Sequence, residues 1–187
     1  MKYLFSHPDW LARVPPSLSS SQKSWLTRPG ALTSGLRQLG LVTLCVIHER
    51  SEGLSKDESA GIRRPPRSPV WVREVLMSID GRPCVFARSL TPLAASHGTW
   101  QGIRKLRNRP LADILYHEPS IHRSDFEVAR IQRHMPLYGT YLHTDQDPSL
   151  ASPKLLARRS VFWRNEQPLL VSECFLPIFW RMLLAYN

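Results

Sequence analysis

The stretch WVREVLMSIDG, residues 71–81, has the pattern of a β-strand that runs into a tight turn. Valine, isoleucine and tryptophan favour strands, and the pair Asp80-Gly81 is typical of a two-residue hairpin turn, which needs positive φ angles. Because side chains alternate along a strand, five of them are predicted to share one face: Trp71, Arg73, Val75, Met77 and Ile79. Residues 71–81 therefore predict the first strand of a hairpin with one largely apolar face.

Arg73 is the one charged residue on that apolar face. Burying a guanidinium is costly unless an anion satisfies it. Two interpretations follow from this cost. In the first, Arg73 forms a structural ion pair with an acidic neighbour. In the second, Arg73 is held ready for an anionic ligand.

A second stretch repeats this design. RRSVFWRNEQPLLVSECFLP (158–177) aligns with REVLMSIDGRPCVFARSLTP (73–92) at a constant offset of 158 − 73 = 85, which superimposes an arginine and two prolines. Each stretch reads as strand, polar turn, proline, strand and proline, so two similar hairpins are predicted. On the later hairpin Glu173 shares a face with apolar neighbours, and its equivalent at the offset is Arg88. One hairpin thus directs a cation, Arg73, into an apolar face, and the other directs a carboxylate.

Composition favours one globular domain with anionic partners. The chain has 187 residues, 42% of them hydrophobic, and 25 Lys+Arg against 15 Asp+Glu give a net charge of +10. Such a charge suits nucleic acid, an anionic membrane surface or an acidic small molecule. The basic residues are spread along the chain without zinc-finger, RNP-like or helix-turn-helix signatures. A small anion is therefore the preferred partner, with no nucleic acid expected.

Three cysteines, Cys45, Cys84 and Cys174, are widely spaced in apolar strands. Their odd number argues against a disulfide framework or a metal site, and buried reduced thiols are expected. The histidines lack metal-ligand spacing, so no metal is expected. The N-terminus has no secretory signal pattern, and the apolar C-terminal run is too interrupted for a spanning helix. We therefore expect a cytoplasmic protein without stable membrane insertion.

Residues 1–24 are rich in proline and serine and are expected to form a loosely ordered arm, followed by one domain over 25–187. Residues 52–69 read as an exposed excursion. Further helices are predicted at 31–39, 100–106 and 111–117, and further strands at 41–48 and 121–131. With the two hairpins this predicts an α+β fold with a single antiparallel sheet of about six strands.

The sequence resembles the chorismate pyruvate-lyases, which make 4-hydroxybenzoate for ubiquinone. The matching pieces are WVREVLMSIDGRPCVFARSLTP (71–92), KLRNRPLADILYHEPSIHRSDFEVARI (105–131), ARRSVFWRNEQPLLVSECFLP (157–177) and, more loosely, WLTRPGALTSGLRQLG (25–40). They occur in the family's order and cover most of residues 25–177. The resemblance implies helices packed on one side of the sheet, an enclosed ligand cavity and no cofactor.

The resemblance also implies roles for four residues. Arg73 matches the arginine that holds the ligand carboxylate, and Glu173 matches the carboxylate near the product hydroxyl; these two are the candidate catalytic residues. Leu32 and Leu111 match positions whose main-chain amides meet the ligand carboxylate. Leu111 follows Pro110, which suits the first turn of a helix and leaves the next amides free for an anion. One departure is that Leu32 stands where a relative has methionine, which leaves an amide contact intact.

The implied activity is conversion of chorismate to 4-hydroxybenzoate and pyruvate, the first committed step of ubiquinone biosynthesis, by a monomer. One alternative is a non-catalytic module of the same fold that binds an aromatic acid. Two residue roles also stay open. Glu173 is either a ligand contact or the structural partner of an arginine such as Arg88. Arg123 is a possible secondary anion contact, with Asp125 and Glu127 as ordinary surface partners.

Overall fold

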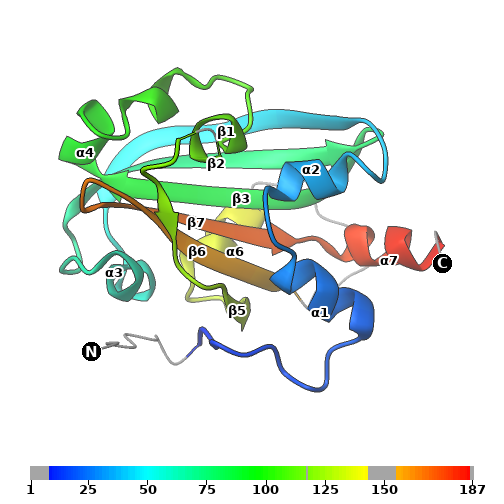
Figure 1. Ribbon diagram of the computed structural model, residues 1–187. Coiled ribbons are helices and arrows are strands. Elements are labelled where there is room, and N and C mark those ends of the chain that lie inside the picture. Colours follow the sequence, from blue (N-terminus) through cyan, green and yellow to red (C-terminus); the bar gives the residue numbers. More distant parts are fainter. Residues whose placement is uncertain (1–8, 117, 143–154, 186–187) are drawn as a thin grey trace.

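A single antiparallel sheet of seven strands forms the centre of the protein, here a computed structural model that describes residues 9–116, 118–142 and 155–185 (Figure 1). The strand order is β1-β2-β3-β7-β6-β4, and β5 also pairs with β6. The strands are β1 (Val42–Gly53), β2 (Pro69–Ile79), β3 (Arg82–Pro92), β4 (His122–Arg123), β5 (Glu127–Arg130), β6 (Leu156–Arg164) and β7 (Gln167–Phe175). The predicted α+β fold with one antiparallel sheet is confirmed, with seven strands in place of about six.

Both predicted hairpins are present, and each turns through two residues with positive φ. The β2–β3 turn uses Asp80 (φ 48°) and Gly81 (φ 76°), and the β6–β7 turn uses Asn165 (φ 46°) and Glu166 (φ 60°). Turns of this hand match the twist of the strands they join. The Asp80 carboxylate also accepts the backbone N–H of Leu41 at 2.9 Å, which fixes the chain just before β1 against the turn.

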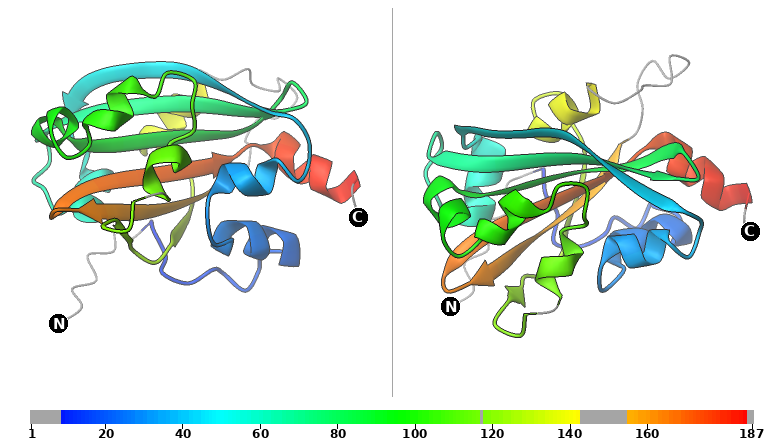
Figure 2. Two further views of the ribbon diagram at one scale, coloured as in Figure 1. Left: turned by 45° about the horizontal axis from the view of Figure 1, so that its top comes forward. Right: turned by 90° about the horizontal axis from the view of Figure 1, so that it is seen from above.

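Helices lie on both faces of the sheet, which differs from the expected single side (Figure 2). We call the side of β2 that carries Arg73 the front face and the side that carries Glu74 the back face. Helices α1, α2 and α5 and the 3-10 helix η1 pack on the front, and α3 and α6 pack on the back. The helices are α1 (Ser20–Thr27), α2 (Leu32–Leu36), α3 (Lys56–Ile62), α4 (Leu93–His97), η1 (Gln101–Lys105), α5 (Ala112–Leu115), α6 (Pro136–Leu142) and α7 (Pro177–Ala185).

Two segments, one expected to be loosely ordered and one expected to be exposed, contain residues packed against the domain. Within the arm 1–24, Trp10 is 1% exposed and its indole N–H donates to the Asp57 carboxylate at 2.8 Å, while Leu11 forms a bridge with Val128. Residues 1–8 lie outside the described part of the chain. The excursion at 52–69 contains α3, capped by the Ser55 hydroxyl, which accepts the N–H of Glu58. The first turn of α3 contains Asp57 and Glu58, whose charges suggested an exposed loop. Both residues are instead buried against the back face.

Three smaller predictions also need correction. The strand expected at 121–131 is two short strands, β4 and β5, and the helix expected at 31–39 ends at Leu36. Cys45 is exposed, whereas Cys84 and Cys174 are buried thiols as expected.

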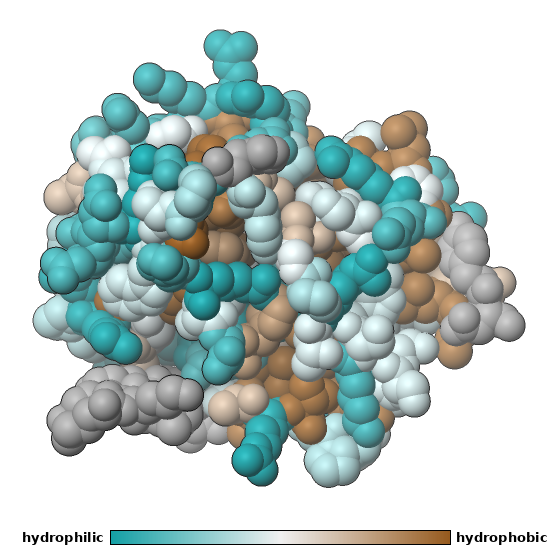
Figure 3. Space-filling view, in the orientation of Figure 1, coloured by the Kyte–Doolittle hydropathy of each residue, from teal (hydrophilic) through white to brown (hydrophobic). Residues whose placement is uncertain are grey.

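The apolar C-terminal segment forms α7, which packs against β3 and exposes its other side to solvent. Leu184 there is 77% exposed, and Figure 3 shows apolar atoms gathered around this helix at the right-hand edge. Among the described residues, no helix combines the length and apolar character needed to cross a membrane.

Candidate active site

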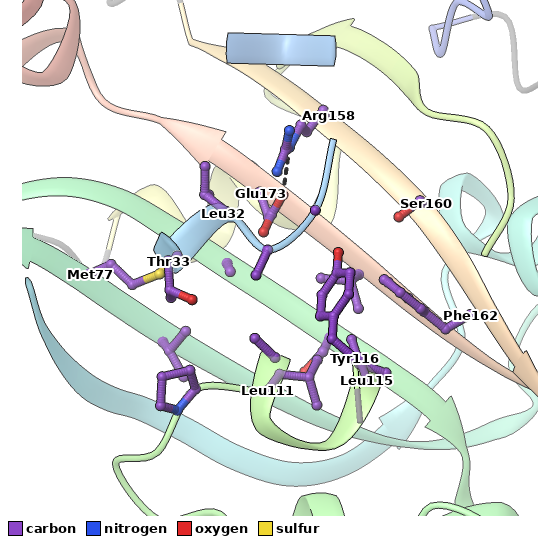
Figure 4. A pocket seen from close by; sticks show the side chains of 18 of the residues that line it. Leu32, Thr33, Met77, Leu111, Leu115, Tyr116, Arg158, Ser160, Phe162 and Glu173 are labelled. Atoms are coloured by element: carbon purple, nitrogen blue, oxygen red, sulfur yellow. Dashed lines mark hydrogen bonds and ion pairs between the residues drawn. The ribbon is translucent and has the colours of Figure 1, made fainter. Parts of the chain in front are cut away.

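A pocket lies between the front face and the segments that lead into α2 and α5 (Figure 4). All four predicted site residues line it: Arg73, Glu173, Leu32 and Leu111. Four of its lining residues carry charge: Arg73, Arg123, Arg158 and Glu173. Most of the others are apolar, including Val75, Met77, Leu115, Phe126, Phe162 and Val171. A few charges in an apolar surround are typical of sites for small organic anions.

Arg73 is 2% exposed and has protein partners on two sides. Its Nε donates to Glu49 Oε1 at 3.1 Å, and its Nη2 donates to the carbonyls of Arg107 at 2.6 Å and Arg109 at 3.3 Å. Within the described residues, Nη1 has no protein partner. Burial lowers the pKa of Arg73 from its ordinary value, opposed by the nearby Glu49 carboxylate. The structural ion pair with Glu49 is present, and it is compatible with the ligand interpretation because Nη1 is left without a partner among the described residues.

The amides of Leu32 and Leu111 have the positions expected for anion donors. Leu32 is the first residue of α2, and Leu111 directly precedes α5. First-turn amides have no intrahelical acceptor, and in the described part of the chain neither amide donates to a backbone carbonyl. Both residues lie at the pocket in Figure 4. Their contact with a ligand carboxylate stays a prediction.

Glu173 is paired with Arg158, its neighbour across the β6–β7 ladder. Arg158 Nε donates to Glu173 Oε2 at 2.6 Å, and Arg158 Nη1 donates to the carbonyls of Trp25 and Arg28 at 3.1 and 2.9 Å. The Arg158 side chain is 1% exposed and that of Glu173 is 16% exposed. The pair leaves Glu173 Oε1 as the oxygen available to a ligand.

The suggested pairing of Glu173 with Arg88 is wrong, because the two lie on opposite faces. In the β3–β7 ladder Ala87 faces Glu173, and Arg88 faces Ser172. A register shift between Met77 and Ser78 in the first hairpin has no counterpart in the second. A one-residue step moves a side chain to the other face of a sheet. Residues that are equivalent at the 85-residue offset therefore lie on opposite faces after the shift, as Arg88 and Glu173 do.

Three pocket residues were not predicted as a group: Arg123, Tyr116 and Ser160. Arg123 Nε donates to Ser160 Oγ at 3.0 Å, and Nη1 donates to the Tyr116 hydroxyl oxygen at 3.2 Å. The expected surface partners of Arg123 are wrong, since Glu127 instead accepts from Arg159 on the back face. Burial raises the pKa of Tyr116, opposed by the positive charge of Arg123. No sequence signal marks Tyr116, which follows a helix of one turn.

Arg158 was visible in the sequence as the offset equivalent of Arg73, but it was not assigned to the site. The structure puts both on the front face. As for metal ligands, the described residues contain no group of three or more His, Cys, Asp or Glu side chains that could hold an ion. His117 and His143 lie outside the described residues.

Comparison with known sequences decides the family. The sequence model described as chorismate lyase matches residues 4–183. This chain belongs to the chorismate lyase family. The match includes residues 4–24, most of the segment that was expected to form a loosely ordered arm.

Relatives in the chorismate lyase family are close. A protein of Bordetella avium named probable chorismate pyruvate-lyase is 58% identical over 172 residues, covering 92% of this chain and 85% of the relative. A probable chorismate pyruvate-lyase of Bordetella pertussis is 56% identical, covering 94% and 92%. Probable chorismate pyruvate-lyase 1 of Pseudomonas fluorescens is 40% identical, covering 91% and 90%.

The fold of this chain is similar to that of a solved effector domain. The effector domain of PhnF from Mycobacterium smegmatis matches with a TM-score of 0.53 at 11% identity, covering 80% of this chain and 90% of that domain. At this identity the likeness concerns the fold alone.

Proposed function

We propose that this protein is a chorismate pyruvate-lyase, which converts chorismate to 4-hydroxybenzoate and pyruvate. The names of its relatives support the activity. The observation that carries the proposal is that Arg73 and Glu173 line the same pocket from strands separated only by β3. Neighbouring strands are about 4.8 Å apart, so the two backbones lie about 10 Å apart with both side chains on one face. That separation suits a ring with a carboxylate at one end and a hydroxyl at the other.

Arg73 would bind the ring carboxylate. Its Nη2 is occupied by two carbonyls, so the contact would use the two N–H groups of Nη1. The amides of Leu32 and Leu111 would complete the carboxylate site. The Glu49 pair and the two carbonyls hold the guanidinium in place before the ligand arrives, which reduces the entropy lost on binding.

The reaction needs no added atom. The ether bond between the ring and the enolpyruvyl oxygen breaks, the neighbouring ring carbon loses its hydrogen, and one hydrogen ends on the methylene carbon of pyruvate. Ring aromatisation drives the step, so positioning and electrostatics supply the catalysis that is required. Glu173 Oε1 would accept from the ring hydroxyl, on the carbon that loses its hydrogen, while Arg158 keeps the carboxylate in position.

The deciding experiment mixes purified protein with chorismate in metal-free buffer. Pyruvate is followed with lactate dehydrogenase and 4-hydroxybenzoate by chromatography. We expect equal amounts of both products, unchanged after dialysis against a chelator, because no cofactor is expected. Tight binding of 4-hydroxybenzoate without turnover would instead indicate a non-catalytic module that binds aromatic acids.

We further propose that the reaction supplies the ring of ubiquinone from the cytoplasm, as the family resemblance implies. The expected result is that this chain restores ubiquinone synthesis in a bacterium unable to make 4-hydroxybenzoate, while an Arg73→Ala variant does so poorly. Sedimentation of the purified protein would test the expected monomer. Rescue by added 4-hydroxybenzoate but not by the native chain would contradict the proposal.

A further inference from the structure

Arg123 is the pocket arginine without a carboxylate. Arg73 pairs with Glu49 and Arg158 pairs with Glu173, but within the described residues Arg123 has only neutral partners. These are the Ser160 hydroxyl at 3.0 Å, the Tyr116 hydroxyl at 3.2 Å and the Phe126 ring, whose centre is 3.6 Å from the guanidinium carbon. An arginine held in position by neutral groups keeps its charge available for a ligand.

The backbone directs Arg123 to the Glu173 end of the pocket. Arg123 faces Phe162 across the β4–β6 ladder, so its side chain shares the front face with Phe162, Ser160 and Arg158. The Phe126 ring also contacts Arg158, with 4.3 Å from the guanidinium carbon to the ring centre. Arg123 therefore stands beside the Arg158–Glu173 pair and not beside Arg73.

The electrostatic surroundings of Arg123 disfavour its charge. Burial lowers its pKa from the ordinary value; Tyr116 and Glu173 oppose that shift, and the positive charge of Arg158 adds to it. A second anion in the pocket would relieve both the burial and the repulsion between the two arginines.

We propose that Arg123, oriented by Tyr116 and Ser160, binds the second carboxylate of the substrate, the one that leaves with pyruvate. The inference rests on the proposed function. Chorismate carries two carboxylates, and its enolpyruvyl ether is attached next to the ring carbon that bears the hydroxyl. With the hydroxyl at Glu173 and the ring carboxylate at Arg73, the second carboxylate falls at the Glu173 end. Arg123 is the cation there without an acidic partner.

This subsite separates substrate from product. The aromatic product has one carboxylate, which Arg73 would bind, and so it would make no carboxylate contact with Arg123. Losing Arg123 should weaken dicarboxylate binding and leave binding of 4-hydroxybenzoate almost unchanged, whereas losing Arg73 should weaken both.

The test compares two stable ligands by calorimetry: 4-hydroxybenzoate, and 3-(carboxymethoxy)-4-hydroxybenzoate, which adds an ether-linked carboxylate. Arg123→Gln should bind the dicarboxylate about 10- to 100-fold more weakly, the range for a lost charge-assisted hydrogen bond, with 4-hydroxybenzoate changed by less than about threefold. Tyr116→Phe should show a smaller loss of the same selectivity. Arg130→Gln, an exposed arginine on β5, is the matched control and should bind both ligands like the native protein.

Equal weakening of both ligands, or no weakening of the dicarboxylate, would overturn the subsite. If Arg123→Gln does not fold, Arg123→Lys decides: a selective partial loss supports the subsite, and native affinity for both ligands overturns it. Binding does not require turnover. A native protein that discriminates the ligands through Arg123 but leaves chorismate intact would refute the proposed activity and keep the subsite. Turnover of chorismate with an unchanged KM in the Arg123 variants would instead support the proposed activity and refute the subsite.

Discussion

The two faces of the sheet hold buried arginines in opposite circumstances. On the back face, Arg88 donates to three carboxylates, those of Glu52, Glu58 and Glu74. On the front face, Arg73 and Arg158 have one carboxylate each, and Arg123 has none among the described residues. Burial alone does not distinguish these sites, since Arg73, Arg88 and Arg158 are each 1–2% exposed.

What distinguishes Arg88 from the front-face arginines is how completely its donors are used. Arg159, also directed to the back face, keeps a buried Nη2 without a hydrogen-bond partner in the described part of the chain. The back-face cluster is closed, because each terminal nitrogen and the Nε of Arg88 meet an acidic oxygen. On the front face, Arg73 and Arg158 are each fixed by backbone carbonyls and one acid, and Arg123 is fixed by two hydroxyl groups. The comparison indicates that the Arg88 cluster serves stability, and it supports the proposal that the front-face arginines bind a ligand.

The sharpest test removes the centre of the back-face cluster. Arg88→Met should lower the free energy of unfolding by about 3–5 kcal/mol, because it leaves Glu58 buried without a counter-charge and leaves Glu74 with only the partly exposed Arg50. Urea unfolding measures this. The control Arg164→Met breaks the half-exposed pair with Glu118 and should cost no more than about 1 kcal/mol. A loss below 1 kcal/mol for Arg88→Met would mean that the cluster is not structural.

The front face should respond mainly in activity. Arg73→Ala should lower kcat/KM for chorismate by about 10- to 100-fold, the effect of a lost charge-assisted hydrogen bond. Its former partner Glu49 is one-third exposed and can turn to water, so stability should fall by less than for Arg88→Met. Lysine should restore only part of the activity, since it lacks the planar fork. Normal kcat/KM in Arg73→Ala would remove Arg73 from the site.

The back-face cluster also predicts how stability depends on pH. Burial raises the pKa of Glu74, but the Thr140 hydroxyl and Arg88 lower it by more, so the folded pKa lies below the ordinary 4.5. A carboxyl with a lowered pKa stabilises the fold above its unfolded pKa and loses that contribution as the pH falls through the folded value. Unfolding free energy should therefore decline below about pH 4.5, and Glu74→Gln should flatten the decline. An equally steep decline in Glu74→Gln would assign it to other acids.

The contrast between the faces also explains what the sequence could predict. The hairpin turns and the strand alternation were readable because both depend on local residues, so Arg73 and Glu173 were each placed among apolar neighbours on their own strand, as the pocket lining shows. The arginine partners were not readable. Glu49 and Glu173 lie on strands whose pairing partners are set by the sheet order, and the register shift after Met77 moves Arg88 to the back.

Segments whose burial depends on distant partners were also misjudged. The charges of Asp57 and Glu58 suggested an exposed loop, but they face Trp10 and Arg88 across the back face. Arg123 looked like a surface residue beside Asp125 and Glu127, and only the pairing of β4 with β6 turns it toward the pocket. Sequence patterns predicted the two hairpins, whereas long-range contacts decide which charges are paired.

The smallest expected effect is the contribution of the Glu173 hydrogen bond with the ring hydroxyl to ligand affinity. One Glu173 oxygen is already bonded to Arg158, and the side chain keeps some contact with solvent, so the ligand hydroxyl exchanges water for Oε1 at a modest gain of about 0.5–1.5 kcal/mol. Native protein should thus bind 4-hydroxybenzoate about 2- to 10-fold more tightly than benzoate. In Glu173→Gln the amide oxygen still accepts, and most of this preference should survive. In Glu173→Ala the preference should disappear while benzoate affinity stays near the native value, because benzoate engages only the Arg73 end. Equal affinity of the native protein for the two ligands, measured by calorimetry, would show that Glu173 serves only as the structural partner of Arg158, which would place this pair with the closed cluster of the back face.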